Sequence, residues 1–150
     1  MTISNTNQSD AAKSGQGYVE TMLSQIPSLE IKGYQFLDSP PMIIFPSCPQ
    51  EIISRIPPNS SSVDVLNWIK DNLSRKNIVG EFFLMFERKG NLDRKTVLPW
   101  ARVVINTNYL WVDLVWDLGH GIYLIPVNMD YFLEIVYDEP DYVLRITYKC

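Results

Sequence analysis

Four β-rich runs follow one another between Trp100 and Cys150. They read WARVVI (100–105), YLWVDLVW (109–116), IYLIPV (122–127) and the pair YFLEIVYDEPDYVLRITY (131–148). β-branched and aromatic residues of this kind favour the pleated surface of a sheet. The connections between the runs are short, which suits antiparallel neighbours and leaves no room for parallel crossovers. This part of the chain therefore predicts an antiparallel meander.

The two final runs show the clearest alternation of apolar and polar side chains. Between residues 142 and 149 the polar set includes Arg145 and Lys149, and between residues 131 and 138 it includes Glu134. Because side chains alternate between the two faces of a strand, this pattern predicts a hairpin with one apolar and one polar face. Glu134 and Arg145 are expected to form a cross-strand ion pair. We expect the polar face to meet solvent and the helices to pack on the other.

The chain upstream of this sheet contains apolar spacings typical of helices. Residues 63–75 repeat apolar side chains at three- and four-residue intervals, after a polar linker NSSS (59–62) that supplies an N-cap. A second helix is expected to begin at Gly17 and to end at Pro27. A short third helix is expected after Pro49, with a buried side formed by Ile52, Ile53 and Ile56.

Alternation and short apolar runs also predict strands elsewhere in the chain. These are IKGYQFL (31–37), MIIFP (42–46), IVGEFFLMFER (78–88) and the segment 98–105, where Pro99 restricts the chain to a strand start or an edge. Together the patterns predict an α+β fold. An antiparallel meander of about five strands in the C-terminal half would be covered on one face by two or three N-terminal helices. Residues 1–16 are expected to form a disordered polar tail, and residues 17–150 a single α+β domain.

The charge is distributed unevenly along the chain. The net charge is −4, yet residues 1–99 contain as many basic as acidic side chains. The whole excess lies in residues 100–150, which contain seven carboxylates: Asp113, Asp117, Asp130, Glu134, Asp138, Glu139 and Asp141. An acidic surface attracts a basic partner, and the alternative is a solvated surface that only keeps the protein soluble. The same balance argues against a protein that binds nucleic-acid phosphates.

Cysteine content and hydropathy bear on the compartment. Cys48 and Cys150 are too few for a disulfide framework, and the sequence leaves open whether they form one bridge. The N-terminal segment MTISNTNQSDAAKSG lacks the apolar core of a signal peptide. No run approaches the roughly 20 apolar residues that span a bilayer. A cytoplasmic protein without membrane association is therefore expected.

No catalytic or cofactor signature stands out. His120 is the single histidine and lies between two glycines in a predicted turn, with Asp117 close enough in sequence to orient its ring. The alternative is an ordinary hairpin turn that uses glycine for positive φ and exposes an indifferent histidine. One histidine and two distant cysteines cannot form a four-ligand zinc site without carboxylates. The run 138–141 lacks the ligand spacing of a calcium loop, and we expect neither a metal nor a cofactor.

These observations favour a small acidic protein that binds and neutralises another protein. It would be of the immunity or antitoxin type and would act on a basic partner such as a bacterial toxin nuclease. Carboxylates would cover the partner's positive surface, and aromatic side chains would anchor the contact. The predicted contact residues are Asp113, Asp117, Asp130, Glu134, Asp138, Glu139, Asp141, Trp111, Trp116 and Tyr137.

Two other hypotheses remain. One is a small-ligand-binding or enzymatic domain, with an aromatic-lined pocket between sheet and helices near His120. The other is a subunit that pairs with a second protein through an exposed edge strand. Replacing His120 with Ala separates the first of these from an inhibitor, because only an enzyme or ligand-binding protein would lose activity.

Overall fold

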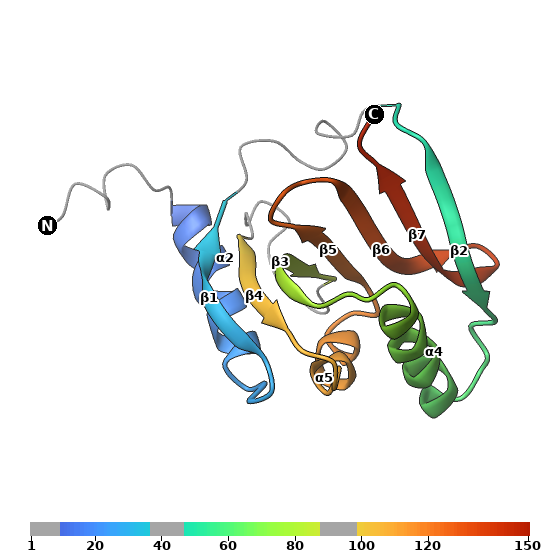
Figure 1. Ribbon diagram of the computed structural model, residues 1–150. Coiled ribbons are helices and arrows are strands. Elements are labelled where there is room, and N and C mark those ends of the chain that lie inside the picture. The colour runs from blue at the N-terminus through green and yellow to red at the C-terminus, as the bar shows by residue number, and fades with distance from the viewer. Residues whose placement is uncertain (1–9, 37–46, 88–98) are drawn as a thin grey trace, which may run out of the picture.

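The computed structural model describes residues 10–36, 47–87 and 99–150. The described part of the chain contains three helices and seven strands (Figure 1). In chain order they are α2 (Asp10–Leu23), β1 (Glu30–Gln35), β2 (Gln50–Ile56), α4 (Ser62–Arg75), β3 (Gly80–Phe86), β4 (Trp100–Ile105), α5 (Trp111–Asp117), β5 (Ile122–Pro126), β6 (Tyr131–Asp138) and β7 (Asp141–Tyr148).

The seven strands form one antiparallel sheet in the order β1-β4-β3-β5-β6-β7-β2. β5, β6 and β7 are a meander of neighbours in sequence, and β3 and β4 extend the sheet beyond β5. The two strands from the N-terminal half lie at the edges, β1 beside β4 and β2 beside β7 (Figure 1). The α+β class is confirmed. The sheet is larger than the five strands expected, because β1 and β2 join it.

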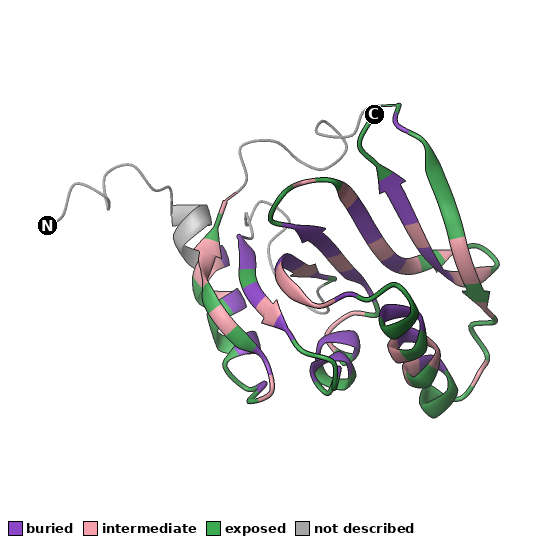
Figure 2. Ribbon diagram, viewed as in Figure 1, coloured by how far each residue is buried: buried purple, intermediate pink, exposed green. Residues whose placement is uncertain are grey.

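One face of the sheet packs with the helices in a continuous apolar core. The core-facing side chains of β6 and β7 are Leu133, Ile135, Leu144 and Ile146, none more than 4% exposed. They share one cluster with buried side chains of α2, α4 and α5. Figure 2 shows this burial in the central strands and on one side of α4 and α5. α5 belongs to the C-terminal half, so the helices are not all N-terminal as predicted.

The opposite face of the sheet carries a second, smaller cluster. Phe83, Ile125 and Phe132 point away from the helices and are at most 8% exposed. Elsewhere the same face is polar: Arg102 of β4 and Glu81 of β3 form an ion pair with 2.6 Å between Nη2 and Oε2. This face is therefore mixed, whereas the face beneath the helices is mainly apolar.

The helix predicted over residues 63–75 is confirmed as α4. Its start is fixed by Ser61, whose Oγ accepts a hydrogen bond of 3.1 Å from the Asp64 amide. Asp64 in the first turn and Arg75 in the last complement the helix dipole. The apolar stripe turns to the core, where Val65, Ile69 and Leu73 are almost fully buried.

The hairpin predicted for the last two runs is confirmed in its register. Glu134 of β6 lies opposite Arg145 of β7, with 3.0 Å between Oε2 and Nε. The turn pairs Asp138 with Asp141, and the Glu139–Pro140 peptide bond within it is cis. Alternation alone was enough to predict the register of this hairpin. One face of both strands is buried, and a slip of one residue would expose its apolar side chains.

The run YLWVDLVW (109–116), predicted as a strand, forms helix α5 instead. The helix spans Trp111–Asp117, and four of its residues are buried: Trp111, Val112, Val115 and Trp116. Four residues of the other stripe are exposed: Leu110, Asp113, Leu114 and Asp117. Both stripes follow helical spacing. Burying two Trp and two Val beneath the sheet outweighs the strand propensity of these residue types.

Residues 50–56, predicted as a helix after Pro49, form the edge strand β2 instead. The pairing of β2 with β7 contains a register shift between Ile52 and Ser54. Such a bulge interrupts the alternation of a strand. Ile53 and Ile56 consequently pack against the core, while Ile52 is 40% exposed. The bulge therefore spaces the isoleucines in a way that resembles a helix.

The boundaries of other predicted elements also shift. α2 begins at Asp10, earlier than the predicted start at Gly17, and ends at Leu23, before Pro27. Residues 10–16 thus belong to this helix, while the rest of the predicted tail lies outside the described residues. β4 begins directly after Pro99, as predicted. The predicted strand over 42–46 lies outside the described residues.

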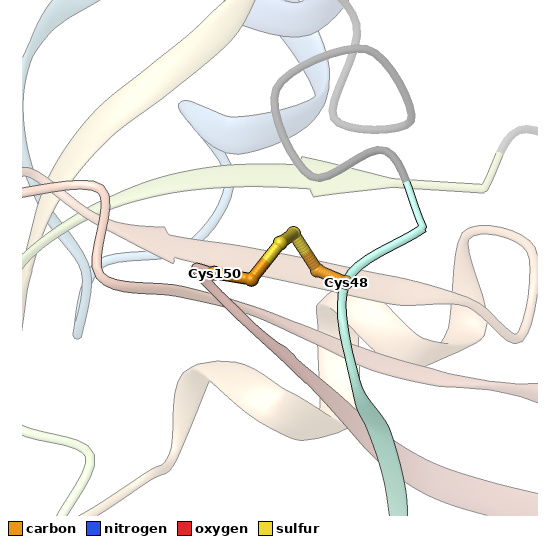
Figure 3. The surroundings of a disulfide bond; sticks show 2 residues. All are labelled: Cys48 and Cys150. Atoms are coloured by element: carbon orange, nitrogen blue, oxygen red, sulfur yellow. A yellow bond between two sulfur atoms is a disulfide. The ribbon is translucent and has the colours of Figure 1, made fainter.

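A disulfide joins Cys48 to Cys150, with 5.4 Å between the two Cα atoms (Figure 3). Cys48 precedes β2 and Cys150 follows β7, so the bond ties together one end of this edge pair. Beside it the Tyr148 amide donates a hydrogen bond of 3.0 Å to the Pro49 carbonyl. Disulfides are typical of oxidising compartments. The cytoplasmic location therefore stays a prediction, and one that this bond does not favour.

Candidate functional site

Six of the seven predicted carboxylates lie on α5, on β6 or at the β6–β7 turn. Glu134 is four residues before the end of β6, and the other members of the β6–β7 hairpin lie at its turn. The turn places Glu139 between the paired residues Asp138 and Asp141. α5 ends at the same place, because His120, just beyond it, lies beside Tyr142 at the start of β7. We call six residues the acidic end: Asp113, Asp117, Glu134, Asp138, Glu139 and Asp141. The sequence predicted these six as contact residues. The tertiary structure joins Glu134 and Asp138 through Arg145 and places Asp113 and Asp117 together on α5.

Asp130 does not belong to this group. It precedes β6, whereas Asp138 ends that strand. A strand advances about 3.3 Å per residue, so the two carboxylates are separated by about 25 Å. Asp130 is exposed at the opposite end of the sheet. This position makes it a natural control for charge changes at the acidic end.

Arg145 neutralises part of the acidic end. Its guanidinium lies 3.0 Å from Glu134 and 3.2 Å from Asp138, and its side chain is 21% exposed. The hydrogen bond to Glu134 and the two negative charges raise the pKa of Arg145, although burial opposes this shift. Arg145 therefore remains a fixed cation at this position. The sequence predicted its contact with Glu134 but not that with Asp138.

The other carboxylates differ in how they are paired. Asp113 lies 2.6 Å from the Lys70 ammonium, and Asp141 lies 3.9 Å from the Arg55 guanidinium. Two members make no ion pair with the described part of the chain: Asp117 and Glu139. Six carboxylates and the three cations that contact them leave a net charge of −3 for these groups.

The three predicted aromatic anchors lie in different environments. Tyr137 is 55% exposed at the end of β6, and its ring centroid lies 5.9 Å from that of Tyr142. Trp111 is 1% exposed and Trp116 is 6% exposed, so both rings belong to the core. Their burial does not suit them to act as surface anchors. Of the three, only Tyr137 offers a ring to a partner.

His120 occupies an unusual turn at this end. Its φ is 58°, so positive φ falls on the histidine itself and not on a neighbouring glycine. Its ring stacks on Trp116, with 5.1 Å between centroids and 13° between planes. Nδ1 lies 3.5 Å from the Tyr142 hydroxyl. Tyr142, rather than the predicted Asp117, is therefore the polar neighbour of the imidazole.

Two hollows open on either side of His120. The first has a volume of about 250 Å³ and lies between α4, α5 and β7; its polar and aromatic lining includes Ser62, Asp113, Trp116, Asp117, His120 and Tyr142. The second has a volume of about 410 Å³ and lies on the face without helices; its lining includes Glu87, His120, Tyr123, Glu134, Tyr137 and Arg145. The predicted pocket between sheet and helices near His120 corresponds in position to the first.

Tyr123 lies in the wall of the second hollow. Its hydroxyl donates a hydrogen bond to the Glu87 carboxylate. Burial, this hydrogen bond and the charge of Glu87 raise the pKa of Tyr123, so the phenol is neutral at ordinary pH. The two residues are 36 positions apart. No local pattern in the sequence could indicate this contact.

The described residues contain no group of three His, Cys, Asp or Glu side chains placed to hold a metal ion. Among the described helices, none is both long enough and apolar enough to cross a membrane. No family model, curated protein or solved structure matches the chain. A functional assignment therefore depends on the geometry and charge of the acidic end.

Proposed function

We propose that the protein binds a basic protein through its acidic end and neutralises it, in the manner of an immunity protein or antitoxin. The observation that supports this proposal is the carboxylates of the β6–β7 turn, Asp138, Glu139 and Asp141, beside the exposed ring of Tyr137. Protein interfaces combine aromatic anchors with a polar rim. Negative charge at such a surface steers and orients a positive partner.

Inhibition would follow from coverage of the partner's positive surface. A nuclease holds phosphates with Lys and Arg side chains, and carboxylates compete for the same groups. Asp117 and Glu139 have no ion pair in the described part of the chain, so both can meet a cation directly. Glu134 and Asp138 would first have to leave Arg145, which costs free energy. We therefore expect Asp117 and Glu139 to contribute most of the charge, with Tyr137 as the anchor.

The experiment that tests this function captures partners on immobilised protein from an extract of the source organism. A basic protein held in stoichiometric amount at low salt, and released at high salt, is the expected result. The captured protein is then purified and its own activity is measured with and without one equivalent of this protein. The proposal predicts that the activity is lost in the complex.

Two variants with the same change in charge provide the matched comparison. Glu139→Lys alters the acidic end, and Asp130→Lys alters the opposite end of the sheet; both side chains are exposed. Glu139→Lys should weaken capture by at least about tenfold, and Asp130→Lys should weaken it much less. If both variants weaken capture equally, the effect depends on net charge and not on position, and the proposed site is wrong. If no protein is retained at low salt, the proposed function is wrong.

A second candidate function is the binding of a small ligand beside His120. The observation in its favour is the pair of hollows that the imidazole separates. Under this hypothesis the protein binds a small ligand or shows activity without any captured protein, and His120→Ala abolishes that binding or activity. His120→Asn is the matched control for the turn, since Asn also tolerates positive φ.

A further inference from the structure

The first hollow has a size that limits what it can hold. It lies between the N-terminal turn of α4, the outer side of α5 and the start of β7, with a volume of about 250 Å³. Pockets for drug-sized ligands have volumes of about 300–1,000 Å³. The hollow is smaller than these, so it suits a single side chain better than an organic cofactor.

The walls of the hollow favour a cation. Asp113 and Asp117 come from α5, and aromatic rings come from Trp116, His120 and Tyr142. Carboxylates beside aromatic rings are the surroundings that guanidinium and ammonium groups prefer. Asp113 is already paired with Lys70, which leaves the exposed Asp117 as the carboxylate available to an incoming cation.

The nearby N-terminus of α4 does not turn the hollow into an anion site. Ser61 caps this helix through its Oγ, and the carboxylate of Asp64 lies in the first turn. The partial positive charge of the helix terminus is therefore already balanced within the chain. Among the described residues of the lining, Asp113 and Asp117 are the only Asp, Glu, Lys or Arg side chains.

The outer side of α5 indicates that the cation belongs to a protein. Leu110 and Leu114 are 59% and 49% exposed, and they alternate with Asp113 and Asp117 at the spacing of one helix face. Leu114 also lines the hollow. Leu110 and Leu114 offer two neighbouring exposed apolar side chains beside the hollow, on which apolar side chains of a protein partner can pack. A free inorganic or small organic cation would make no apolar contact with these two leucines.

We propose that this hollow receives one arginine side chain of the partner, and that apolar residues flanking this arginine pack on Leu110 and Leu114. The proposal rests on the proposed function and adds a contact on α5 to the Tyr137 anchor on β6. Arginine suits the site because its planar guanidinium both donates a bidentate hydrogen bond to a carboxylate and stacks on aromatic rings. The Asp117 carboxylate is the expected acceptor.

The first test needs no knowledge of the partner. Acetyl-Leu-Arg-Leu-amide is titrated into the isotopically labelled protein, and amide chemical shifts are followed by NMR. Shifts are expected at Leu114, Asp117 and His120, and not at Val127 or Asp130 at the opposite end. The same peptide with neutral citrulline in place of arginine should produce at least about tenfold weaker binding. Equal shifts from both peptides would overturn the proposal, as would shifts only at the far end.

The second test uses the partner captured under the proposed function. Asp117→Asn removes one charge without changing shape, and Asp130→Asn makes the same change at the far end. Leu114→Gln and Val127→Gln form a second matched pair, since both native side chains are exposed apolar residues. The first member of each pair should raise Kd by at least about tenfold and the second by less than about twofold.

The outcomes of these tests separate the two proposals. Unchanged Kd for Asp117→Asn and Leu114→Gln, with a captured partner, would overturn the arginine site and leave the inhibitor function standing. If the arginine peptide binds but no protein is captured, the inhibitor function is wrong and the hollow is still a site for an arginine side chain. A peptide with lysine that binds more tightly than the arginine peptide would overturn the choice of arginine.

Discussion

Reduction of the Cys48–Cys150 disulfide is expected to lower the stability of the protein sharply. The bond joins residues separated by 102 positions, and it therefore restricts the unfolded chain strongly. In the loop-closure model a bridge across about 100 residues contributes about 4.7 kcal/mol at 25 °C. Folded domains are stable by only about 5–15 kcal/mol in total. The reduced protein should therefore lie close to its limit of stability.

The effect should also be local. Among the described strands, β2 pairs only with β7, and the bond ties together one end of this pair. Most side chains of β2 are exposed or half-buried, so little apolar burial holds the strand in place. After reduction, amide hydrogen exchange in β2 should accelerate more than exchange in the central strands β3 and β5.

The assay is urea unfolding of the same preparation with and without reductant. With a slope of about 2 kcal/mol per molar urea, the midpoint should fall by about 2 M after reduction. A variant with Cys48→Ser and Cys150→Ser should resemble the reduced protein and should not respond to reductant. A shift below about 0.3 M, or reaction of thiol reagents with the untreated native protein, would refute this reasoning.

Three further predictions concern the remaining polar contacts. Stability should fall above about pH 10, because the folded-state pKa of Tyr123 is raised above its unfolded value and the unfolded chain releases that proton first; Tyr123→Phe should reduce this dependence in urea titrations. Tyr109→Phe should lower the free energy of unfolding by about 1–3 kcal/mol, because the buried hydroxyl hydrogen-bonds two backbone carbonyls; a change below about 0.3 kcal/mol in urea unfolding would contradict this. Arg145→Met should cost about 1.5–3 kcal/mol by leaving Glu134 half-buried without its cation, and Glu134→Gln in the same chain should restore part of the loss in a double-mutant cycle.

Where burial follows one regular period, the sequence predicts the local structure well. α4 has an N-cap, charges suited to its dipole and an apolar stripe, and all of them agree. The β6–β7 hairpin has two alternating strands, so its register and the Glu134–Arg145 pair follow from the pattern. Local preference and tertiary environment favour the same structure in these two elements.

Two elements differ from prediction because tertiary packing overrides residue type. In α5 the residues resemble those of a strand, but the core accepts two Trp and two Val from one side of a helix. In β2 the bulge spaces Ile53 and Ile56 as a helix would, although the segment is held as an edge strand. The spacing was visible in both segments, but it did not show which partner surface each would meet.

The candidate site shows the same division. The excess of carboxylates after residue 100 is evident from the sequence, as is the lone histidine. The sequence does not show that Asp130 is separated from the other six carboxylates, because this depends on where each strand begins and ends. The burial of Trp111 and Trp116 likewise depends on α5 being a helix.

The sequence by itself determined the α+β class, the final hairpin, the helix α4 and the uneven charge, since each of these depends on residue type and local period. The tertiary structure alone decided the strand order, the Cys48–Cys150 bond, the Tyr123–Glu87 contact and the hollow beside His120. These features join residues that are distant in the chain. Such contacts arise from the packing of whole elements against a shared core, and no local pattern of side chains encodes them.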